Sequence, residues 1–256
     1  MINLKIHRDP RRLAADAAWQ TAEAARRAVD QQGRCSLVLA GGATPLALYE
    51  RLAAASGEQA MPWRQTHLFW SDERCLPPDY AQSNYAAAQR VLLELVPVPP
   101  GNIHRIQGEA ADHQAEARRY QREISAFFGD REPAFDLVLL GMGADGHTAS
   151  LFPGSPALQA AGRLATAVEP GPGARPAVRR ITLTLDAINR AHQVMFLVTG
   201  RAKAAAAGRI LAGRDQAASA YPAARVRPRG ELWWHLDVEA AGRLPTLIAE
   251  SLKPLG

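Results

Sequence analysis

A histidine surrounded by glycines is the feature of this sequence best suited to chemistry. The segment GMGADGHTASLFP (residues 141–153) comes directly after the apolar run FDLVLL (residues 135–140). Because an unperturbed imidazole has a pKa of about 6.5, His147 can accept a proton from water near neutral pH. Asp145 can orient the imidazole, and backbone N–H groups of glycines such as Gly143 can stabilise a developing oxyanion. The segment therefore predicts general-base catalysis by His147.

The same segment also matches a dinucleotide-binding pattern. Gly141, Gly143 and Gly146 satisfy G-x-G-x-x-G after a strand. That pattern opens a long helix, and a second strand ending in an acid follows about 20 residues later. Here Pro153 would end a helix almost at once, and residues 163–176 are mostly loop. We therefore reject a dinucleotide site.

A metal site is the other alternative, since Asp145-x-His147 offers two kinds of ligand. The remaining histidines are isolated along the chain, and no third ligand has a suitable spacing. We therefore expect no catalytic metal. These histidines are His7, His67, His104, His113, His192 and His235.

Paired glycines precede an expected helix near the N-terminus. Gly41 and Gly42 follow the apolar run CSLVLA (residues 35–40), and Thr44 is expected to cap the helix with Pro45 at its first position. Backbone N–H groups and the helix dipole at such a turn favour an anion. A tight turn that needs glycine for backbone reasons alone is equally consistent with this motif.

Charged residues follow two further apolar runs. Arg74 comes after THLFWS (residues 66–71), and its planar fork suits a phosphate or carboxylate; a neighbouring acid such as Asp72 can hold that fork in place. Asn84 follows the irregular loop after Arg74, at the start of an expected helix. Lys203 comes after QVMFLVT (residues 193–199), in the first turn of an expected helix, where a cation is favourable only beside an anion.

Apolar runs alternate with Ala-rich helical stretches, which predicts a parallel sheet covered on both faces. We expect one domain over residues 1–256. Ligands of such sheets gather where the strands end. The expected strands are 35–40, 66–71, 135–140, 181–185, 193–199 and 232–235. The expected helices are 11–31, one from residue 44, 83–95, 112–128, 201–211 and 238–252.

Composition excludes several classes of partner. The formal charge of +5 comes from scattered basic residues, not from a stripe interleaved with aromatics, so we expect no nucleic acid. No apolar stretch approaches the ~20 residues that span a bilayer, and the first residues lack the apolar region of a signal peptide, so we expect no membrane association. Two cysteines suggest thiols in a reducing compartment, and hence a cytoplasmic protein.

Taken together, the motifs resemble the 6-phosphogluconolactonase family over essentially the whole chain. The matching segments are GGATP (41–45), SDER (71–74) with Ser83-Asn84, residues 141–153, Arg180-x-Thr182-Leu183-Thr184 and Gly200-x-x-Lys203. The resemblance implies a three-layer α/β/α fold with a mainly parallel, modified Rossmann-like sheet, shared with glucosamine-6-phosphate and ribose-5-phosphate isomerases. It implies hydrolysis of 6-phosphoglucono-1,5-lactone to 6-phosphogluconate in the oxidative pentose phosphate pathway, without a required cofactor. The chain departs from the family around residues 217–225.

The resemblance also gives the residues their expected roles. His147 would activate water, with Asp145 beside it. The substrate and its phosphate would be bound by Gly41, Gly42, Thr44, Asp72, Arg74, Asn84, Gly143, Arg180 and Lys203. The expected partner is a small sugar-phosphate lactone, and the expected state is a monomer or a weak homo-oligomer.

Two other functions are weighed against lactone hydrolysis. Glucosamine-6-phosphate isomerases and deaminases look similar up to the histidine but continue with Asn-Glu-Pro, whereas this chain has Ser150-Leu151-Phe152-Pro153. Without that acid, the proton transfer needed for isomerisation lacks a partner. A sugar-phosphate sensor would keep Arg74 and Lys203, need not keep His147, and would usually carry an additional domain.

Overall fold

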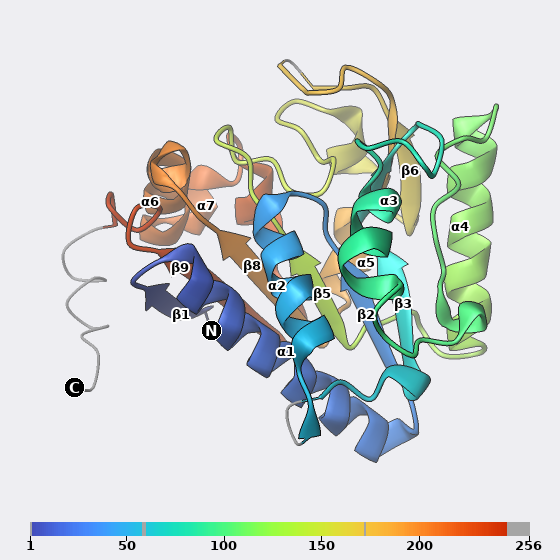
Figure 1. Ribbon diagram of the computed structural model, residues 1–256. Coiled ribbons are helices and arrows are strands. Elements are labelled where there is room, and N and C mark those ends of the chain that lie inside the picture. The colour runs from blue at the N-terminus through green and yellow to red at the C-terminus, as the bar shows by residue number, and fades with distance from the viewer. Residues whose placement is uncertain (1, 58–59, 172, 245–256) are drawn as a thin grey trace.

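A six-stranded parallel sheet forms the centre of the molecule (Figure 1). The computed structural model describes residues 2–57, 60–171 and 173–244. The spatial order is β1-β9-β8-β5-β2-β3, and every neighbouring pair is parallel. The expected α/β fold with a mainly parallel sheet is confirmed. The strands are β1 (Ile2–His7), β2 (Cys35–Leu39), β3 (Thr66–Trp70), β5 (Leu137–Leu140), β8 (Gln193–Val198) and β9 (Glu231–Asp237).

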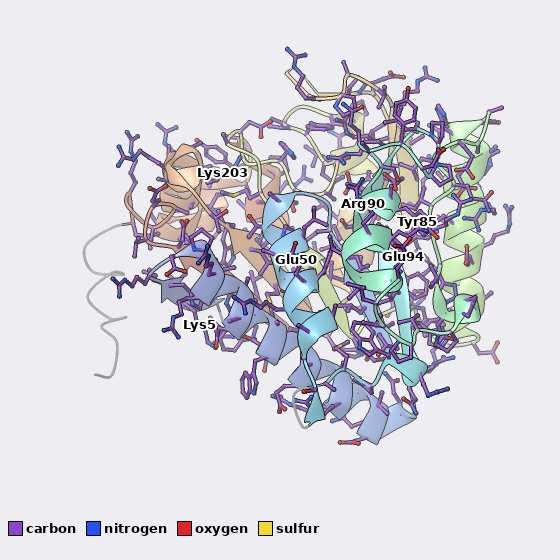
Figure 2. The ribbon with its side chains drawn as sticks, in the orientation of Figure 1. Lys5, Glu50, Tyr85, Arg90, Glu94 and Lys203 are labelled. Atoms are coloured by element: carbon purple, nitrogen blue, oxygen red, sulfur yellow. The ribbon has the colours of Figure 1, made fainter. Side chains whose placement is uncertain are left out.

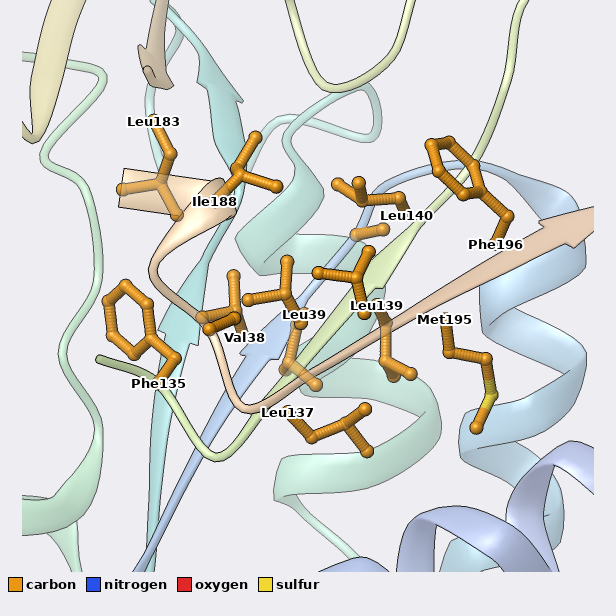
Figure 3. Packing of buried hydrophobic residues seen from close by; sticks show 14 of the residues in the cluster. Val38, Leu39, Phe135, Leu137, Leu139, Leu140, Leu183, Ile188, Met195 and Phe196 are labelled. Carbon is orange, nitrogen blue, oxygen red and sulfur yellow. The ribbon is translucent and has the colours of Figure 1, made fainter. Parts of the chain in front are cut away.

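The central strands are continuous apolar runs because both of their faces are covered. Every residue of β2 and of β5 is buried. Figure 3 shows side chains of β2, β5 and β8 packed into one core, together with residues from the segments around Leu183 and Ile188. This core fixes the positions of the strand ends, and therefore of the loops that follow them.

Helices flank the sheet. α1 and α2 lie side by side on one face, in front of the sheet in Figure 1. α1 begins after Asp9, whose carboxylate accepts a hydrogen bond from the Arg12 amide, and ends at Gly33 in the left-handed conformation. The helices are α1 (Pro10–Gln32), α2 (Ala43–Ala54), α3 (Asn84–Ala88), α4 (His113–Phe128), α5 (Leu185–Asn189), α6 (Ala204–Ala212) and α7 (Arg214–Ala217).

A second, antiparallel sheet was not expected from the sequence. It consists of β4 (Asp72–Arg74), β7 (Arg180–Leu183) and β6 (Ala165–Val168), in the order β4-β7-β6. Residues 72–74, expected in a loop, are therefore a strand, and so are residues 165–168. β4 consists of charged residues and β6 is short, so neither shows a strand pattern in the sequence. Both form their backbone hydrogen bonds with β7. β1 was also missed, although its Ile2, Leu4 and Ile6 alternate with polar residues, which is the pattern of a strand covered on one face.

Several helix boundaries differ from expectation. The helix expected over 83–95 is α3, capped by the Ser83 hydroxyl, followed by a π-helical turn at Gln89–Leu93. α2 begins one residue before Thr44, and its N-cap is Gly42, which has no side chain to offer; the expected Thr44 cap is wrong. Of the helix expected over 238–252, residues 238–244 form turns, and the rest lies outside the described residues.

In the described part of the chain, no helix combines the length and the apolar character needed to span a bilayer.

Candidate active site

The loops that carry the candidate residues meet at the point where the order of the sheet reverses. β3 lies on one side of β2, and β5, the next strand of this sheet along the chain, lies on the other. The connections after β2 and β5 therefore leave in opposite directions and open a crevice at the carboxyl ends of the strands. Ligands of open α/β sheets bind at such a position.

A cleft of about 240 Å³ occupies this position. It is formed by the loops after β2, β3, β5 and β8, the four segments singled out in the sequence. Lining residues include Gly41, Gly42, Thr44, Asp72, Arg74, Asn84, Gly143, His147 and Thr199. Eight of the eleven predicted site residues therefore line one cavity, and Asp145, Arg180 and Lys203 do not.

The His147 imidazole is held by Asp145. Nδ1 of His147 lies 2.6 Å from Oδ1 of Asp145, and the same carboxylate oxygen accepts the His147 amide at 3.2 Å. A proton on Nδ1 satisfies the carboxylate, which leaves Nε2 as the acceptor. Nε2 has no hydrogen-bond partner among the described residues. Phe152 packs against the ring at a centroid distance of 4.9 Å, so the imidazole is fixed on two sides.

Gly143 makes room for the imidazole. A side-chain carbon at this position would lie 2.2 Å from Nδ1 of His147, closer than any real contact. The Gly143 amide donates to the His147 carbonyl at 2.8 Å, and the Gly146 amide donates to the Gly143 carbonyl at 3.0 Å. These two N–H groups close the loop and are not free for an oxyanion. The amides of Gly41 and Gly42, in the turn expected to favour an anion, have no acceptor among the described residues and are better placed to stabilise an oxyanion.

Asn84 links Asp72 and Arg74 of β4. Its amide group donates to the Asp72 backbone carbonyl at 2.8 Å, and its Oδ1 accepts a hydrogen bond from the Arg74 guanidinium at 2.6 Å. Gly41 packs against this amide so closely that a side-chain carbon there would lie 2.0 Å from Oδ1. The guanidinium also donates to the Gln82 carbonyl at 2.9 Å. Arg74 is therefore held on one side and open to the cleft on the other.

The Glu73 side chain connects β4 to residues 83–85. Its buried carboxylate accepts hydrogen bonds from the amides of Arg74, Asn84 and Tyr85, each at 2.7 Å, and from the Ser83 hydroxyl at 3.0 Å. Burial raises the pKa of Glu73, and these backbone hydrogen bonds act in the opposite direction. This carboxylate therefore joins β4 to the start of α3.

Ser150 is a site residue that the sequence analysis did not single out. Its hydroxyl donates to Oδ2 of Asp72 at 2.6 Å, and its amide donates to the Thr182 hydroxyl at 3.2 Å. Asp72 and Ser150 are both buried. The loop that carries His147 is thereby tied to β4 and β7. The available signal was the position of Ser150 within the histidine motif.

The N-terminus of α2 faces the same cleft. The first N–H groups of a helix have no acceptor within it, and Gly42 provides no side-chain cap. The Thr44 hydroxyl is hydrogen-bonded to the Thr199 hydroxyl at 2.7 Å, which joins the loops after β2 and β8. Together with the helix dipole, these amides form a site suited to an anion.

Two predicted basic residues do not line the cleft. Arg180 is buried, its guanidinium donates to the carbonyls of Val178 and Pro176, and burial lowers its pKa. Lys203 ends a short helical turn (Arg201–Lys203) between β8 and α6, and its side chain is partly buried (Figure 2). That turn is anchored by buried Asp237, whose carboxylate accepts the Gly200 amide at 3.0 Å.

The segment 217–225, where the sequence departs from the family that it resembles, contacts the histidine loop. The Ala223 amide donates to the Gly146 carbonyl at 3.0 Å. Tyr221 packs beside Gly146, and its hydroxyl accepts a hydrogen bond from Arg209 at 3.1 Å. The segment therefore supports the loop from outside.

Comparison with known proteins places these observations in context. A family model described as glucosamine-6-phosphate isomerases/6-phosphogluconolactonase matches residues 8–234. A 6-phosphogluconolactonase of Synechocystis sp. is 42% identical over 221 residues, which make up 85% of this chain and 88% of the relative. The solved 6-phosphogluconolactonase of Trypanosoma brucei superimposes with a TM-score of 0.83 at 32% identity and covers 96% of this chain and 99% of its own.

A solved monomeric glucosamine-6-phosphate deaminase has the same fold. It superimposes with a TM-score of 0.81 over 94% of this chain and 99% of its own, at 22% identity. At this level of identity the likeness concerns the fold alone, and the choice between activities depends on the residues of the site.

Proposed function

The chain belongs to the glucosamine-6-phosphate isomerase/6-phosphogluconolactonase family, and we propose that it hydrolyses 6-phosphoglucono-1,5-lactone to 6-phosphogluconate with His147 as the general base. The resemblance found in the motifs is confirmed by the family match and by relatives of the same description. The observation that carries the mechanism is the hydrogen bond between Nδ1 of His147 and Asp145 at the edge of the cleft.

In this mechanism, Nε2 of His147 takes a proton from water as the water oxygen attacks the lactone carbonyl carbon. The carbonyl oxygen becomes an oxyanion, which the amides around Gly41 and Gly42 stabilise. The tetrahedral intermediate then collapses and breaks the bond between C1 and the ring oxygen. The imidazolium returns its proton to that oxygen, which becomes the free hydroxyl of the product. The resulting carboxylic acid ionises in water, and His147 is regenerated.

The phosphate is bound by Arg74 and the N-terminus of α2. Arg74 offers two parallel N–H groups in a fixed position, and the N-terminus of α2 adds the amide of Thr44 and the dipole. Lys203, which does not line the cleft, is not needed for this binding. Asn84, itself bonded to Asp72, and the Gln82 carbonyl keep Arg74 in place. Binding of the phosphate orients the lactone carbon toward the activated water.

The rival activity is deamination or isomerisation of glucosamine 6-phosphate. After His147 this chain continues with Ser150-Leu151-Phe152-Pro153, and the Phe152 ring packs against the imidazole. An apolar ring at this position cannot transfer protons between carbon atoms of an open-chain sugar. This contact favours lactone hydrolysis over isomerisation.

The decisive experiment is a lactonase assay of the wild type and of His147→Ala, corrected for spontaneous opening of the lactone. We expect kcat/KM of the variant to fall by roughly 10²–10⁴-fold. Unchanged activity in His147→Ala would refute the role of His147. Ammonia release from glucosamine 6-phosphate, without lactone hydrolysis, would refute the assigned reaction.

A further inference from the structure

A cluster of metal-ligand side chains lies where α1 crosses the β1 edge of the main sheet. His7 ends β1, His235 lies on β9, and Asp16 projects from α1 toward both. None of the three lines the catalytic cleft. His235 is fully buried, whereas His7 and Asp16 are partly buried. The three come from separate elements and meet only in the folded chain.

The distances among the three ligand atoms match a tetrahedral metal site. Nε2 of His7 lies 3.1 Å from Nδ1 of His235; Oδ2 of Asp16 lies 3.9 Å from the first atom and 3.6 Å from the second. Zinc binds nitrogen and oxygen ligands at about 2.0–2.1 Å, which places tetrahedral ligands about 3.4 Å apart. The three ligand atoms are therefore arranged approximately as three corners of a tetrahedron. Shifts of less than about 1 Å would bring each of the three distances to the value expected around zinc.

Gln20 prepares His235 for this role. Nε2 of His235 lies 3.1 Å from Oε1 of Gln20, so Nε2 carries the proton and donates it to this oxygen. Nδ1 therefore keeps its lone pair, which is directed toward His7 and Asp16. Metal-binding histidines commonly have their second ring nitrogen held by such an outer acceptor. In the metal-free state, Nε2–H of His7 donates to this lone pair; metal binding needs His7 to carry its proton on Nδ1 instead.

Lys5 provides the positive charge in the metal-free protein. Its ammonium lies 2.8 Å from Oδ2 of Asp16 and 5.3 Å from the centre of the Trp233 ring. It lies on the same side of the molecule as β1 and α1 (Figure 2). A bound dication would compete with this ammonium for the carboxylate. The contact with Trp233 gives the lysine an alternative position.

We propose that His7, Asp16 and His235 bind one zinc-type divalent cation, which ties edge strand β1 and helix α1 to β9. Two imidazoles and one carboxylate suit zinc and its neighbours in the first transition row. The fourth position is open to water. The site has a structural role, because it lies apart from the lactonase cleft and would hold edge strand β1 against its neighbours.

The test uses the full-length protein, treated with a chelator and then titrated with Co²⁺ as a spectroscopic substitute for zinc. We expect one equivalent to bind, with the visible bands of tetrahedral coordination, and saturating Zn²⁺ to raise the melting temperature by roughly 5 °C at 100 times Kd. Absence of these bands in the folded wild type would overturn the proposal.

Variants locate the site. His7→Gln keeps a donor for Nδ1 of His235 and should therefore fold, but its Kd should rise at least about tenfold; Asp16→Asn is a second variant with the same expectation. Lys5→Gln removes the competing cation and should bind at least as tightly as the wild type. His147→Ala, at the other histidine–aspartate pair, and exposed His192→Gln should bind as the wild type does. Wild-type affinity in both His7→Gln and Asp16→Asn, or its loss in His147→Ala, would refute the assignment.

Discussion

Oδ1 of Asp145 accepts two hydrogen bonds from His147, one from Nδ1 of the ring at 2.6 Å and one from the backbone amide at 3.2 Å. One carboxylate oxygen thus fixes both the loop backbone and the ring orientation. Because the pair is separated by a single residue, Gly146, the arrangement is local and does not depend on distant segments. It leaves Nε2 as the only ring nitrogen that can act as a base.

Asp145→Asn should show how the Asp145 carboxylate contributes to the orientation and protonation of the His147 ring. An asparagine amide that donates to Nδ1 forces the ring proton onto Nε2, where it blocks the base. We expect kcat to fall by roughly 10²-fold, with a smaller change in KM. Steady-state kinetics over a range of pH would measure this, with exposed Asp79→Asn as the control. A wild-type kcat in Asp145→Asn would show that the carboxylate does not orient the ring.

Arg74→Lys should weaken phosphate binding. Lysine retains the charge but loses the planar fork that is held by Asn84 and the Gln82 carbonyl. We expect KM to rise by about tenfold or more, with kcat less affected. The loss should disappear with glucono-1,5-lactone, which has no phosphate. An equal loss on both lactones would contradict a phosphate-binding role for Arg74.

Gly41→Ala should displace Asn84, which holds Arg74, by steric overlap. The added carbon would lie 2.0 Å from Oδ1 of Asn84, so the Asn84 amide must move and release Arg74. We expect a higher KM for the lactone and a loss of about 1–3 kcal/mol in unfolding free energy. Gly101→Ala is the matched control, because nothing lies within 4 Å of a side-chain carbon there. Wild-type KM in Gly41→Ala would contradict the role of this contact.

Ser150→Ala should leave the buried Asp72 carboxylate without its shortest hydrogen bond. An unsatisfied buried acceptor costs about 1–3 kcal/mol, more for a charged one. Chemical denaturation should therefore show a loss of this size, whereas Ser125→Ala, at an exposed position of α4, should change little. Equal stability of the two variants would mean that Asp72 finds another donor.

His67 should make the protein less stable in mild acid. Burial, reinforced by His104 and Arg34, lowers the pKa of His67 to about 4, below the value of about 6.5 expected in the unfolded chain. Between these values the unfolded chain binds more protons, so the contribution of His67 is complete above pH 6.5 and is lost as the pH falls toward 4.

Denaturation at several pH values measures this effect. We expect His67→Gln to reduce the slope of unfolding free energy against pH between 4 and 6.5 by about 1 kcal/mol per pH unit or less, since the ring is partly exposed. His67 contacts His104, which is in turn bonded to Glu123. Exposed His192→Gln is the control and should keep the wild-type slope. Identical slopes in wild type and His67→Gln would contradict the lowered pKa.

The sequence by itself determined the fold class and the loops that carry the chemistry. Strands buried on both faces must be continuous apolar runs, as in β2 and β5, and such runs are visible without a structure. Parallel strands place the segments that follow them at one edge, so Gly41, Arg74 and His147 could be expected together. The contact between His147 and Asp145 was also accessible, because two residues in one loop cannot be far apart.

Only the tertiary structure decided which distant side chains touch. Ser150 and Asp72 are 78 residues apart, and His7 and His235 are 228 residues apart, yet each pair is hydrogen-bonded. His7 and His235 were judged too isolated to be ligands. Such contacts depend on strand order, register and side-chain direction, which the whole core sets collectively. The residues around each partner in the sequence do not indicate which distant side chain it will contact, because many pairings would suit the same local segment.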